Sequence, residues 1–233
     1  MAGAVCFDLG GTLIDRERAE GLRAHWVARG VRIGIRDAEA VIYRMDRVFM
    51  ESYPNLWHEG GGEFQRRYWG RVHAELGLVA PGLAVCAGWG GGWRVYGDAL
   101  VGLRQLRRAG CRLALLSNWD HSGTAVLAAT GLTDFFEVVG ISAALGREKP
   151  DPEAFAWVAD ALDLPAESIT HVGDNVWDDV QGARTAGMKP VLVHRHPEWH
   201  APPPLPPDVT VVDDLAACVP YLLRRTAREA VAL

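Results

Sequence analysis

Residues 4–12 read AVCFDLGGT, a short apolar run that ends in an acid and is followed by two glycines and a threonine. An apolar run of this length without polar interruption is typical of a strand that is buried on both faces of a parallel sheet. The glycines indicate a tight turn directly after the strand. We therefore expect a central parallel strand whose carboxyl end presents Asp8.

Beyond residue 95, short apolar runs alternate with segments of helical periodicity. Because strands that alternate with helices form parallel sheets through right-handed crossovers, this pattern predicts an α/β fold with a doubly wound, Rossmann-like sheet. Asp98 is expected to cap the helix that it begins. Strands are predicted at residues 112–116, 138–141, 169–172, 191–193 and 209–212, and helices at residues 98–110, 152–162, 176–186 and 214–223.

The segment 16–95 does not follow this alternation. It has helical periodicity near residues 19–29, 37–53 and 63–76, and it contains no convincing strand pattern. We therefore predict a Rossmann-like core domain of residues 1–15 and 96–233 and an inserted helical cap domain of residues 16–95.

Charge and hydropathy exclude several classes of protein. The 233-residue chain has a net charge of −5, and its basic residues are scattered among acids, so we expect no binding to nucleic acid or to an anionic membrane. It has no apolar stretch near the roughly 20 residues that span a membrane, and its first residues lack a signal-peptide pattern. These features predict a cytoplasmic protein, monomeric by default.

Polar residues gather after the predicted strands, at the edge where ligands bind in open parallel sheets. Lys149 is notable among them, because only two of the 24 basic residues are lysines, and a lysine in such a chain indicates a need for a compact ammonium group. The residues expected at this edge are Asp8, Gly10, Gly11, Thr12, Ser117, Asn118, Lys149, Asp174, Asp178 and Asp179.

These residue types suit phosphoryl chemistry. Asp8 and Asp174 can hold Mg²⁺, which takes few carboxylates and keeps water and substrate oxygens as its other ligands. Together with Lys149, the cation would neutralise a phosphoryl group that faces an anionic nucleophile. Backbone N–H groups of the glycine turn and the Ser117 hydroxyl can receive the phosphoryl oxygens. Attack by the carboxylate would produce an aspartyl-phosphate, which water then cleaves.

Four segments resemble the four motifs of the haloacid dehalogenase superfamily, in the same order along the core. They are FDLGGTL at residues 7–13, LLSN at 115–118, KPDP at 149–152 and VGDN at 172–175, the last followed by Asp178 and Asp179. The segments SNWD and KPDPEAF look closest to the branch of haloacid dehalogenase-like hydrolase domain-containing proteins. The helical segment 16–95 is similar to the smaller type of cap in this superfamily.

The resemblance implies a role for each residue at the site. Asp8 is the nucleophile and a metal ligand, and Thr12 orients its loop. Lys149 stabilises the charge of the transferring group. Metal binding is implied for Asp8, the Gly10 carbonyl, Asp174 and the supporting carboxylates Asp178 and Asp179, and substrate binding for Gly11, Ser117, Asn118, Trp119 and Lys149. The expected activity is that of a magnesium-dependent phosphatase acting on a small phosphorylated metabolite.

Gly10 departs from the pattern of the phosphatases. They usually carry an aspartate two positions after the nucleophile, which protonates the leaving group, and such acid–base help is worth on the order of 10²–10⁴ in rate. A phosphatase with glycine here would be slow, would prefer good leaving groups or would recruit another acid. Candidates for that acid are Asp15, His58, Asp120 and His121.

Three other functions share some of these features. A 2-haloacid dehalogenase-like hydrolase also lacks the second acid, and Asn175 to Asp178 resembles its fourth motif, but Asp174 favours a metal-dependent enzyme. The phosphonate-cleaving relatives use a cap lysine, and residues 16–95 contain none. A protein that binds a phosphorylated ligand without turnover remains an alternative, although a pure binder has little need for the nucleophile.

Overall fold

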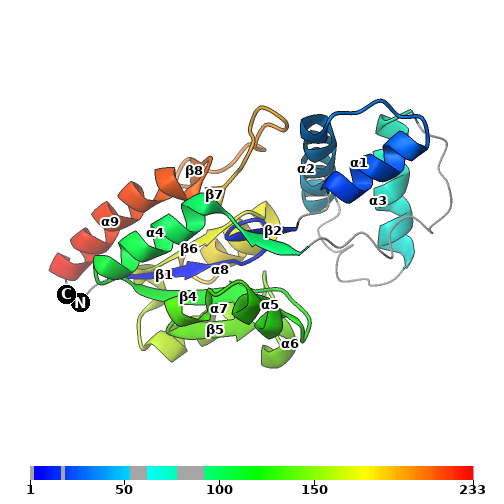
Figure 1. Ribbon diagram of the computed structural model, residues 1–233. Coiled ribbons are helices and arrows are strands. Elements are labelled where there is room, and N and C mark those ends of the chain that lie inside the picture. Colours follow the sequence, from blue (N-terminus) through cyan, green and yellow to red (C-terminus); the bar gives the residue numbers. More distant parts are fainter. Residues whose placement is uncertain (1–2, 17–18, 53–61, 78–91, 233) are drawn as a thin grey trace. The chain divides into compact units, whose positions relative to one another are not determined.

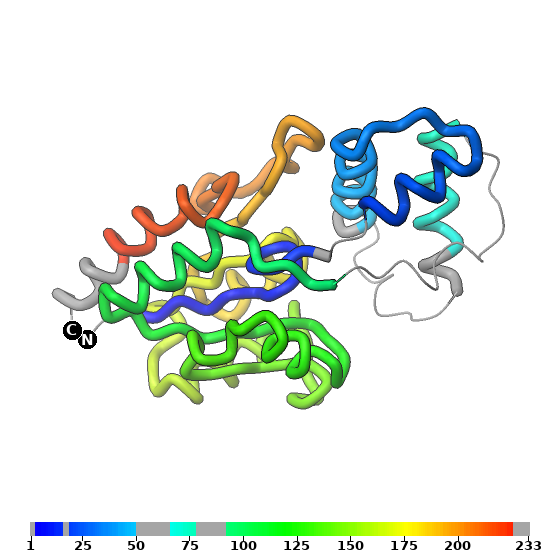
Figure 2. The backbone as a smooth tube through the Cα atoms, viewed as in Figure 1, coloured from blue at the N-terminus to red at the C-terminus, as the bar shows by residue number. Residues whose placement is uncertain are grey.

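The computed structural model describes residues 3–16, 19–52, 62–77 and 92–232 (Figures 1 and 2). The chain forms two compact units. The first consists of Met1–Asp15, Trp93–Arg195 and Pro203–Leu233, and the second consists of Arg16–Gly92 together with His196–Pro202.

The first unit contains a six-stranded sheet in which all neighbouring strands run parallel. The predicted doubly wound α/β fold is confirmed, and the strand that opens the sequence lies inside the sheet. The order across the sheet is β5 (Val138–Ile141), β4 (Arg112–Ser117), β1 (Ala4–Phe7), β6 (Ile169–Gly173), β7 (Lys189–Val193) and β8 (Thr210–Val212).

Strand β1 explains why its sequence is apolar without interruption. Val5 and Phe7 point into a core cluster shared with α4 and α9, whereas Ala4 and Cys6 point into a second cluster shared with α7 (Figure 1). Because successive side chains of a strand face opposite sides of the sheet, both sets of positions must be apolar when helices cover both sides. These helices are α4 (Gly97–Arg108), α7 (Pro152–Leu162) and α9 (Leu215–Ala232).

Shorter helices complete this unit: α5 (Gly123–Ala129), α6 (Ser142–Leu145), α8 (Gly182–Thr185) and the 3₁₀ turns Thr133–Phe135 and Ala166–Ser168. Among the described residues, no helix is both long and apolar enough to cross a membrane.

The helix predicted over residues 176–186 is wrong in type. Residues Val176–Gln181 form a π-helix, and α8 follows it as a separate short helix. The Asn175 side chain accepts hydrogen bonds from the backbone N–H groups of Trp177 and Asp178 and so caps the start of this segment. Helical periodicity in sequence does not distinguish a π-turn from an α-turn, and π-turns are frequent at functional sites.

The predicted capping role of Asp98 is also wrong. Helix α4 begins at Gly97, so Asp98 lies in its first turn, and no side chain caps this helix. The Asp98 carboxylate accepts a hydrogen bond from the backbone N–H of Leu215, at the start of α9, and pairs with Arg195. Its partners lie about a hundred residues away in sequence, where local pattern does not reach.

Two short strands flank the segment that was expected to be only helical. Strand β2 (Ile14–Arg16) pairs with β3 (Trp93–Val95) in a separate two-stranded sheet. The expectation of no strand within 16–95 is therefore wrong at residues 93–95. Three residues are too few to produce a recognisable alternation of polar and apolar side chains.

The second unit is built from helices α1 (Ala19–Ala28), α2 (Ile35–Ser52) and α3 (Gly62–Glu75). Their shared core includes Trp26, Phe49 and Tyr68, and the Tyr68 hydroxyl donates a 2.6 Å hydrogen bond to Asp46. Residues 196–202 belong to this unit because His196 and Trp199, stacked on each other with ring centroids 4.0 Å apart, both pack edge-on against Tyr43 of α2.

Candidate active site

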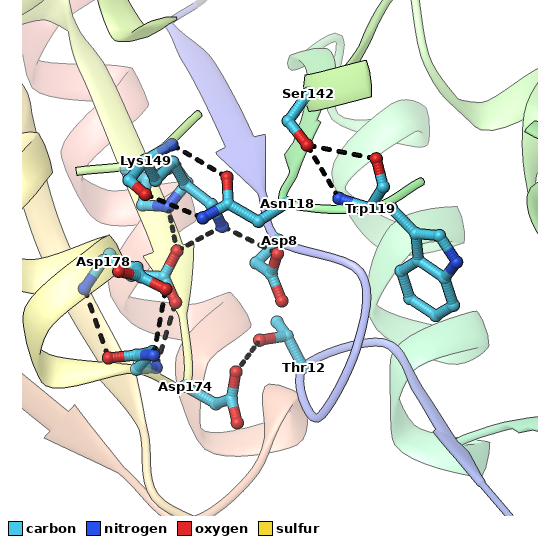
Figure 3. Close-up of polar contacts among 11 residues, drawn as sticks. Asp8, Thr12, Asn118, Trp119, Ser142, Lys149, Asp174 and Asp178 are labelled. Carbon is cyan, nitrogen blue, oxygen red and sulfur yellow. Dashed lines mark hydrogen bonds and ion pairs between the residues drawn. The ribbon is translucent and has the colours of Figure 1, made fainter. Parts of the chain in front are cut away.

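The carboxyl edge of the six-stranded sheet brings the predicted polar residues together. Phe7 of β1 is in register with Leu115 of β4 and with Val172 of β6, so the residues after these strands emerge side by side. Asp8 follows β1, Ser117 ends β4, and Asp174 follows β6. Figure 3 shows Asp8, Lys149, Asp174 and Asp178 converging from three chain segments.

Lys149 lies at the centre of this cluster. Its Nζ donates to Asp8 Oδ1 at 2.7 Å and to Asp179 Oδ1 at 2.6 Å, and the side chain is only 2% exposed. Burial alone would lower the pKa of Lys149, but the carboxylates of Asp179 and Asp8 outweigh it and raise the pKa above its ordinary value. Lys149 is therefore stabilised as a charged ammonium group and is bound to Asp8.

Asp179 is held by donors on both of its oxygens. Oδ1 accepts from Lys149 and from His171 Nε2 at 2.8 Å, while Oδ2 accepts from the backbone N–H of Asn175 at 2.9 Å. Burial favours the protonated form, but the Lys149 charge and the hydrogen bond from His171 reverse this and lower the pKa of Asp179. Asp179 is thus an ionised carboxylate whose lone pairs are already used to orient Lys149.

His171 was missed by the sequence analysis. It lies in the middle of β6, is fully buried and packs edge-on against Phe155 with ring centroids 5.1 Å apart. Burial lowers the pKa of His171, so the neutral ring donates its Nε2–H to Asp179. A signal was present, because a histidine inside an otherwise apolar buried strand needs a polar partner.

Three buried carboxylates could share a divalent cation. Asp8, Asp174 and Asp179 each offer an oxygen, and these atoms lie within 4.8 Å of one another; Asp178 is not in this group. Oxygen donors of this kind fit Mg²⁺. Since Asp179 already accepts three hydrogen bonds, Asp8 and Asp174 are the carboxylates best placed to bind the cation, and Thr12 Oγ1 orients Asp174 through a weak 3.4 Å hydrogen bond.

Two carboxyl groups here have raised pKa values. Burial raises the pKa of Asp8 to about 7. The Lys149 charge opposes this shift, and the negative charges of Asp179 and Asp174 reinforce it. Burial and the nearby Asp179 charge also raise the pKa of Asp178 to about 7, and its Oδ2 accepts a 3.1 Å hydrogen bond from Asn175 Nδ2. Without a bound metal cation, the carboxyl groups of this site would carry more negative charge in their ionised forms than the single Lys149 ammonium group can balance.

Asn118 contacts the main chain of the segment that carries Lys149. Its Nδ2 donates to the Lys149 carbonyl at 2.7 Å, and its Oδ1 accepts from the Lys149 N–H at 2.8 Å. Both polar groups of the amide are engaged, so this geometry aligns Lys149. Ser117, predicted to bind the transferring group, is buried at the end of β4 in register with Ile141 of β5.

The loop after Asp8 has a fixed shape. Gly11 adopts a positive φ of 74°, and a Cβ there would overlap the Asp174 carboxylate, so only glycine fits. The buried Arg195 donates to the Thr12 carbonyl at 2.9 Å while it pairs with Asp98. Arg195 was not predicted, because nothing in the local sequence distinguishes it from the other arginines.

Gly10 and Trp119 are neighbours. A Cβ at Gly10 would lie 3.3 Å from Cζ3 of the Trp119 ring, and Figure 3 shows that ring beside the loop after Asp8. The Trp119 N–H donates to Ser142 Oγ at 2.9 Å, its Nε1 donates to Ser122 Oγ at 3.2 Å, and its ring packs edge-on against Trp93 at 4.7 Å between centroids. An aromatic edge thus fills the space beside residue 10.

The structure speaks against Asp120 as the replacement acid. The Asp120 carboxylate accepts a 2.7 Å hydrogen bond from the backbone N–H of Ser122, and its hydrogen bonds with Ser122 lower its pKa, which makes it a poor proton donor. His58 lies outside the described residues.

Comparisons with known proteins agree with this geometry. A family model described as haloacid dehalogenase-like hydrolase matches residues 2–187. Haloacid dehalogenase-like hydrolase domain-containing protein 3 from Homo sapiens is 39% identical over 101 residues, which cover 43% of this chain and 40% of that protein. The match thus spans less than half the length of this relative.

Two similar proteins match over most of their length. A protein named "Phosphoglycolate phosphatase, plasmid" from Cupriavidus necator is 30% identical over 209 residues, covering 82% of this chain and 80% of the relative. A solved structure of L-2-haloacid dehalogenase from Xanthobacter autotrophicus has chloropropionic acid covalently bound. Its sequence is 25% identical to this chain, the TM-score is 0.63, and the match covers 96% of this chain and 99% of that one. Both a phosphatase and a dehalogenase are therefore similar to this chain.

Proposed function

The chain belongs to the haloacid dehalogenase-like hydrolase family, and from this premise we propose that it is a magnesium-dependent phosphatase that acts on a small phosphorylated metabolite through an aspartyl-phosphate on Asp8. The observation that carries the proposal is the buried Lys149 ammonium group 2.7 Å from Asp8, together with Asp174 in the same group of carboxylates. A site with one cation and several buried carboxylates is suited to a second cation and to an anionic substrate.

The protein's own residues would then have the following roles. Asp8 attacks phosphorus with one carboxylate oxygen, and Lys149 stabilises the negative charge that the phosphoryl oxygens carry during transfer. Asp179, held by His171, and Asn118 orient Lys149. Magnesium bound to Asp8 and Asp174 would supply further charge neutralisation. We further propose that Ser117 and Gly11 bind the substrate and that the Gly10 carbonyl binds the metal.

The division of labour between the two units is also part of the proposal. The Rossmann-like core, residues 1–15 and 96–233, would carry the chemistry, and the helical segment 16–95 would act as the cap that selects the substrate. Residues 196–202 lie inside the core range in sequence, but they pack on Tyr43 of the helical unit, so we assign them to the cap as an exception to that range.

A carbon–halogen hydrolase is the second candidate, and Gly10 favours it. Halide leaves without a proton, so this reaction needs no acid at residue 10, and a dehalogenase is among the similar structures. Asp174 favours the phosphatase, because a buried carboxylate beside the nucleophile would repel a 2-haloacid anion unless a metal ion neutralises it. A binder of phosphorylated ligands is the third candidate.

One assay separates these functions. We expect release of p-nitrophenol from p-nitrophenyl phosphate that requires Mg²⁺ and stops with EDTA, and no chloride release from 2-chloropropionate. Chloride release that is indifferent to EDTA would establish the dehalogenase instead. Absence of both activities, combined with Mg²⁺-dependent binding of inorganic phosphate in calorimetry, would establish the binder.

A further inference from the structure

The residues around Asp8 differ in their exposure to solvent. Lys149, Asp174 and Asp179 are each at most 3% exposed. Gly10, Gly11 and Trp119 are half-buried and therefore reach solvent. Within the described core unit, Gly10 and Trp119 therefore form a solvent-exposed side of the site, along which the part of a substrate that extends away from Asp8 can lie.

Trp119 is fixed on this side by contacts at both ends of the residue. Its backbone N–H donates to Ser142 Oγ, and its carbonyl accepts from the same hydroxyl at 3.0 Å. The indole Nε1–H is engaged by Ser122, and Trp93 covers one part of the ring. Since the polar atom of the indole is already bonded, the ring edge that approaches Gly10 is apolar.

This ring crowds residue 10. The position of a Cβ on Gly10 is only 3.3 Å from Trp119 Cζ3, so the ring would have to move even for alanine. A carboxyl group needs still more room. The backbone does not impose glycine here, since Gly10 is not among the glycines with positive φ. A side chain at residue 10 and the Trp119 ring therefore compete for the same space.

We infer that Trp119 takes the place of a leaving-group acid and forms an apolar contact surface for the leaving group, so that the preferred substrates are phosphate esters of acidic aromatic alcohols. This inference rests on the proposed phosphatase function. Attack by Asp8 forms a P–O bond to its carboxylate, and the P–O bond to the leaving group breaks with the electron pair on the leaving oxygen. Without a proton donor at residue 10 the leaving group departs as an anion, which an acidic phenol forms readily and an alkyl alcohol does not.

The first test compares leaving groups in two tryptophan variants. In Trp119→Ala, kcat/KM for p-nitrophenyl phosphate is expected to fall about tenfold, which is the scale of one aromatic contact. For acetyl phosphate, which has a good leaving group but no ring, kcat/KM should fall at most about threefold. Trp157→Phe, in the other core cluster, is the matched control and should leave both rates unchanged. Equal losses on the two substrates in Trp119→Ala would contradict an aromatic contact.

The second test asks whether the ring excludes the acid. Gly10→Asp alone should not accelerate hydrolysis of ethyl phosphate, whose alcohol is a poor leaving group. The double variant Gly10→Asp with Trp119→Ala should accelerate it by about tenfold or more, because the carboxyl group then has room to donate a proton. If the single variant gains as much as the double variant, Trp119 does not exclude an acid and the inference is wrong.

A binding experiment separates this inference from the proposed function. Phenylphosphonate should bind in the presence of Mg²⁺ about tenfold more tightly than methylphosphonate, and Trp119→Ala should remove the difference. This preference requires no turnover. If the wild-type protein hydrolyses no phosphate ester but keeps the Trp119-dependent preference, the phosphatase proposal fails while the aromatic contact stands. If turnover is present and the preference is absent, the aromatic contact fails alone.

Discussion

The two sides of Asp8 differ in almost every physical property. On one side, the buried Lys149 donates short hydrogen bonds to Asp8 and Asp179, and the buried Asp174 lies in the same group of carboxylates. On the other side, Gly10 and Trp119 are half-buried and carry no charge. Under the proposed function, the first side would balance and hold the phosphoryl group, whereas Gly10 and Trp119 have no acid that could supply a proton. If the proposed function holds, the site keeps the electrostatics of phosphoryl transfer while it lacks an acid for the leaving group.

The largest effect is expected from Asp8→Asn, which removes the nucleophile and keeps the side-chain shape. Turnover of p-nitrophenyl phosphate should fall on the order of 10³-fold or more, since loss of a nucleophile leaves only the contributions of binding and electrostatics. Asp160→Asn changes an exposed carboxylate of α7 and serves as the control with unchanged turnover. Retention of more than a tenth of the activity in Asp8→Asn would remove Asp8 from the chemistry.

Lys149→Met tests the charged side directly. Asp8 and Asp179 would then face each other without a counter-charge, and leaving buried charges unpaired costs about 3–5 kcal/mol of unfolding free energy. Urea denaturation of the metal-free protein measures this loss. Lys189→Met changes the only other lysine, which lies at the start of β7, and should cost less than about 1 kcal/mol. Equal losses in the two variants would show that Lys149 has no special electrostatic role.

Magnesium affinity is expected to depend on pH, because a proton and the metal ion compete for Asp8. With its pKa raised to about 7, Asp8 is ionised above that pH and protonated below it. The Kd for Mg²⁺ should therefore be constant above pH 7 and rise by up to about tenfold per pH unit below it, the limit for one displaced proton. Isothermal titration calorimetry between about pH 5.5 and 8.5 measures this; an affinity independent of pH over that range contradicts it.

The smallest effect concerns the uncharged side. Gly10→Ala should lower the unfolding free energy by less than about 1 kcal/mol, because its methyl group meets the Trp119 ring at the distance of a tight contact. In a Trp119→Ala background the same substitution should cost nothing. Chemical denaturation of the four proteins gives the coupling free energy, expected at about 0.5–1 kcal/mol. A coupling of zero would mean that the two residues do not share this space.

The sequence predicts more of the charged side than of the uncharged side. Asp8, Lys149 and Asp174 are predicted because each follows or precedes a recognisable element, and parallel strands bring their carboxyl ends to one edge. His171 and Arg195, which orient this cluster, are not predicted, because their partners Asp179 and Thr12 lie on other elements. Residue type and local pattern do not state which distant group a buried polar atom contacts.

The same reasoning applies to local structure. The strands of the six-stranded sheet are predicted within one or two residues, since burial on both faces requires apolar side chains throughout β1. The sequence does not predict three local features: the π-helix at Val176–Gln181, the strand Trp93–Val95 and the hydrogen bond from the Leu215 N–H of α9 to Asp98. The short strand and the Asp98 contact depend on groups remote in sequence, which leave no periodic trace. The π-helix is missed because helical periodicity does not distinguish a π-turn from an α-turn.

By itself, the amino-acid sequence determined the class of fold, the edge of the sheet that carries the polar residues and the absence of an acid at Gly10. Hydrophobic periodicity and residue type are local properties, and they suffice for these conclusions. Only the tertiary structure decided that Lys149 joins Asp8 to Asp179 and that Trp119 fills the space beside Gly10. Those features are distances between residues more than a hundred positions apart or on separate elements, and close packing settles such distances only when the chain is folded.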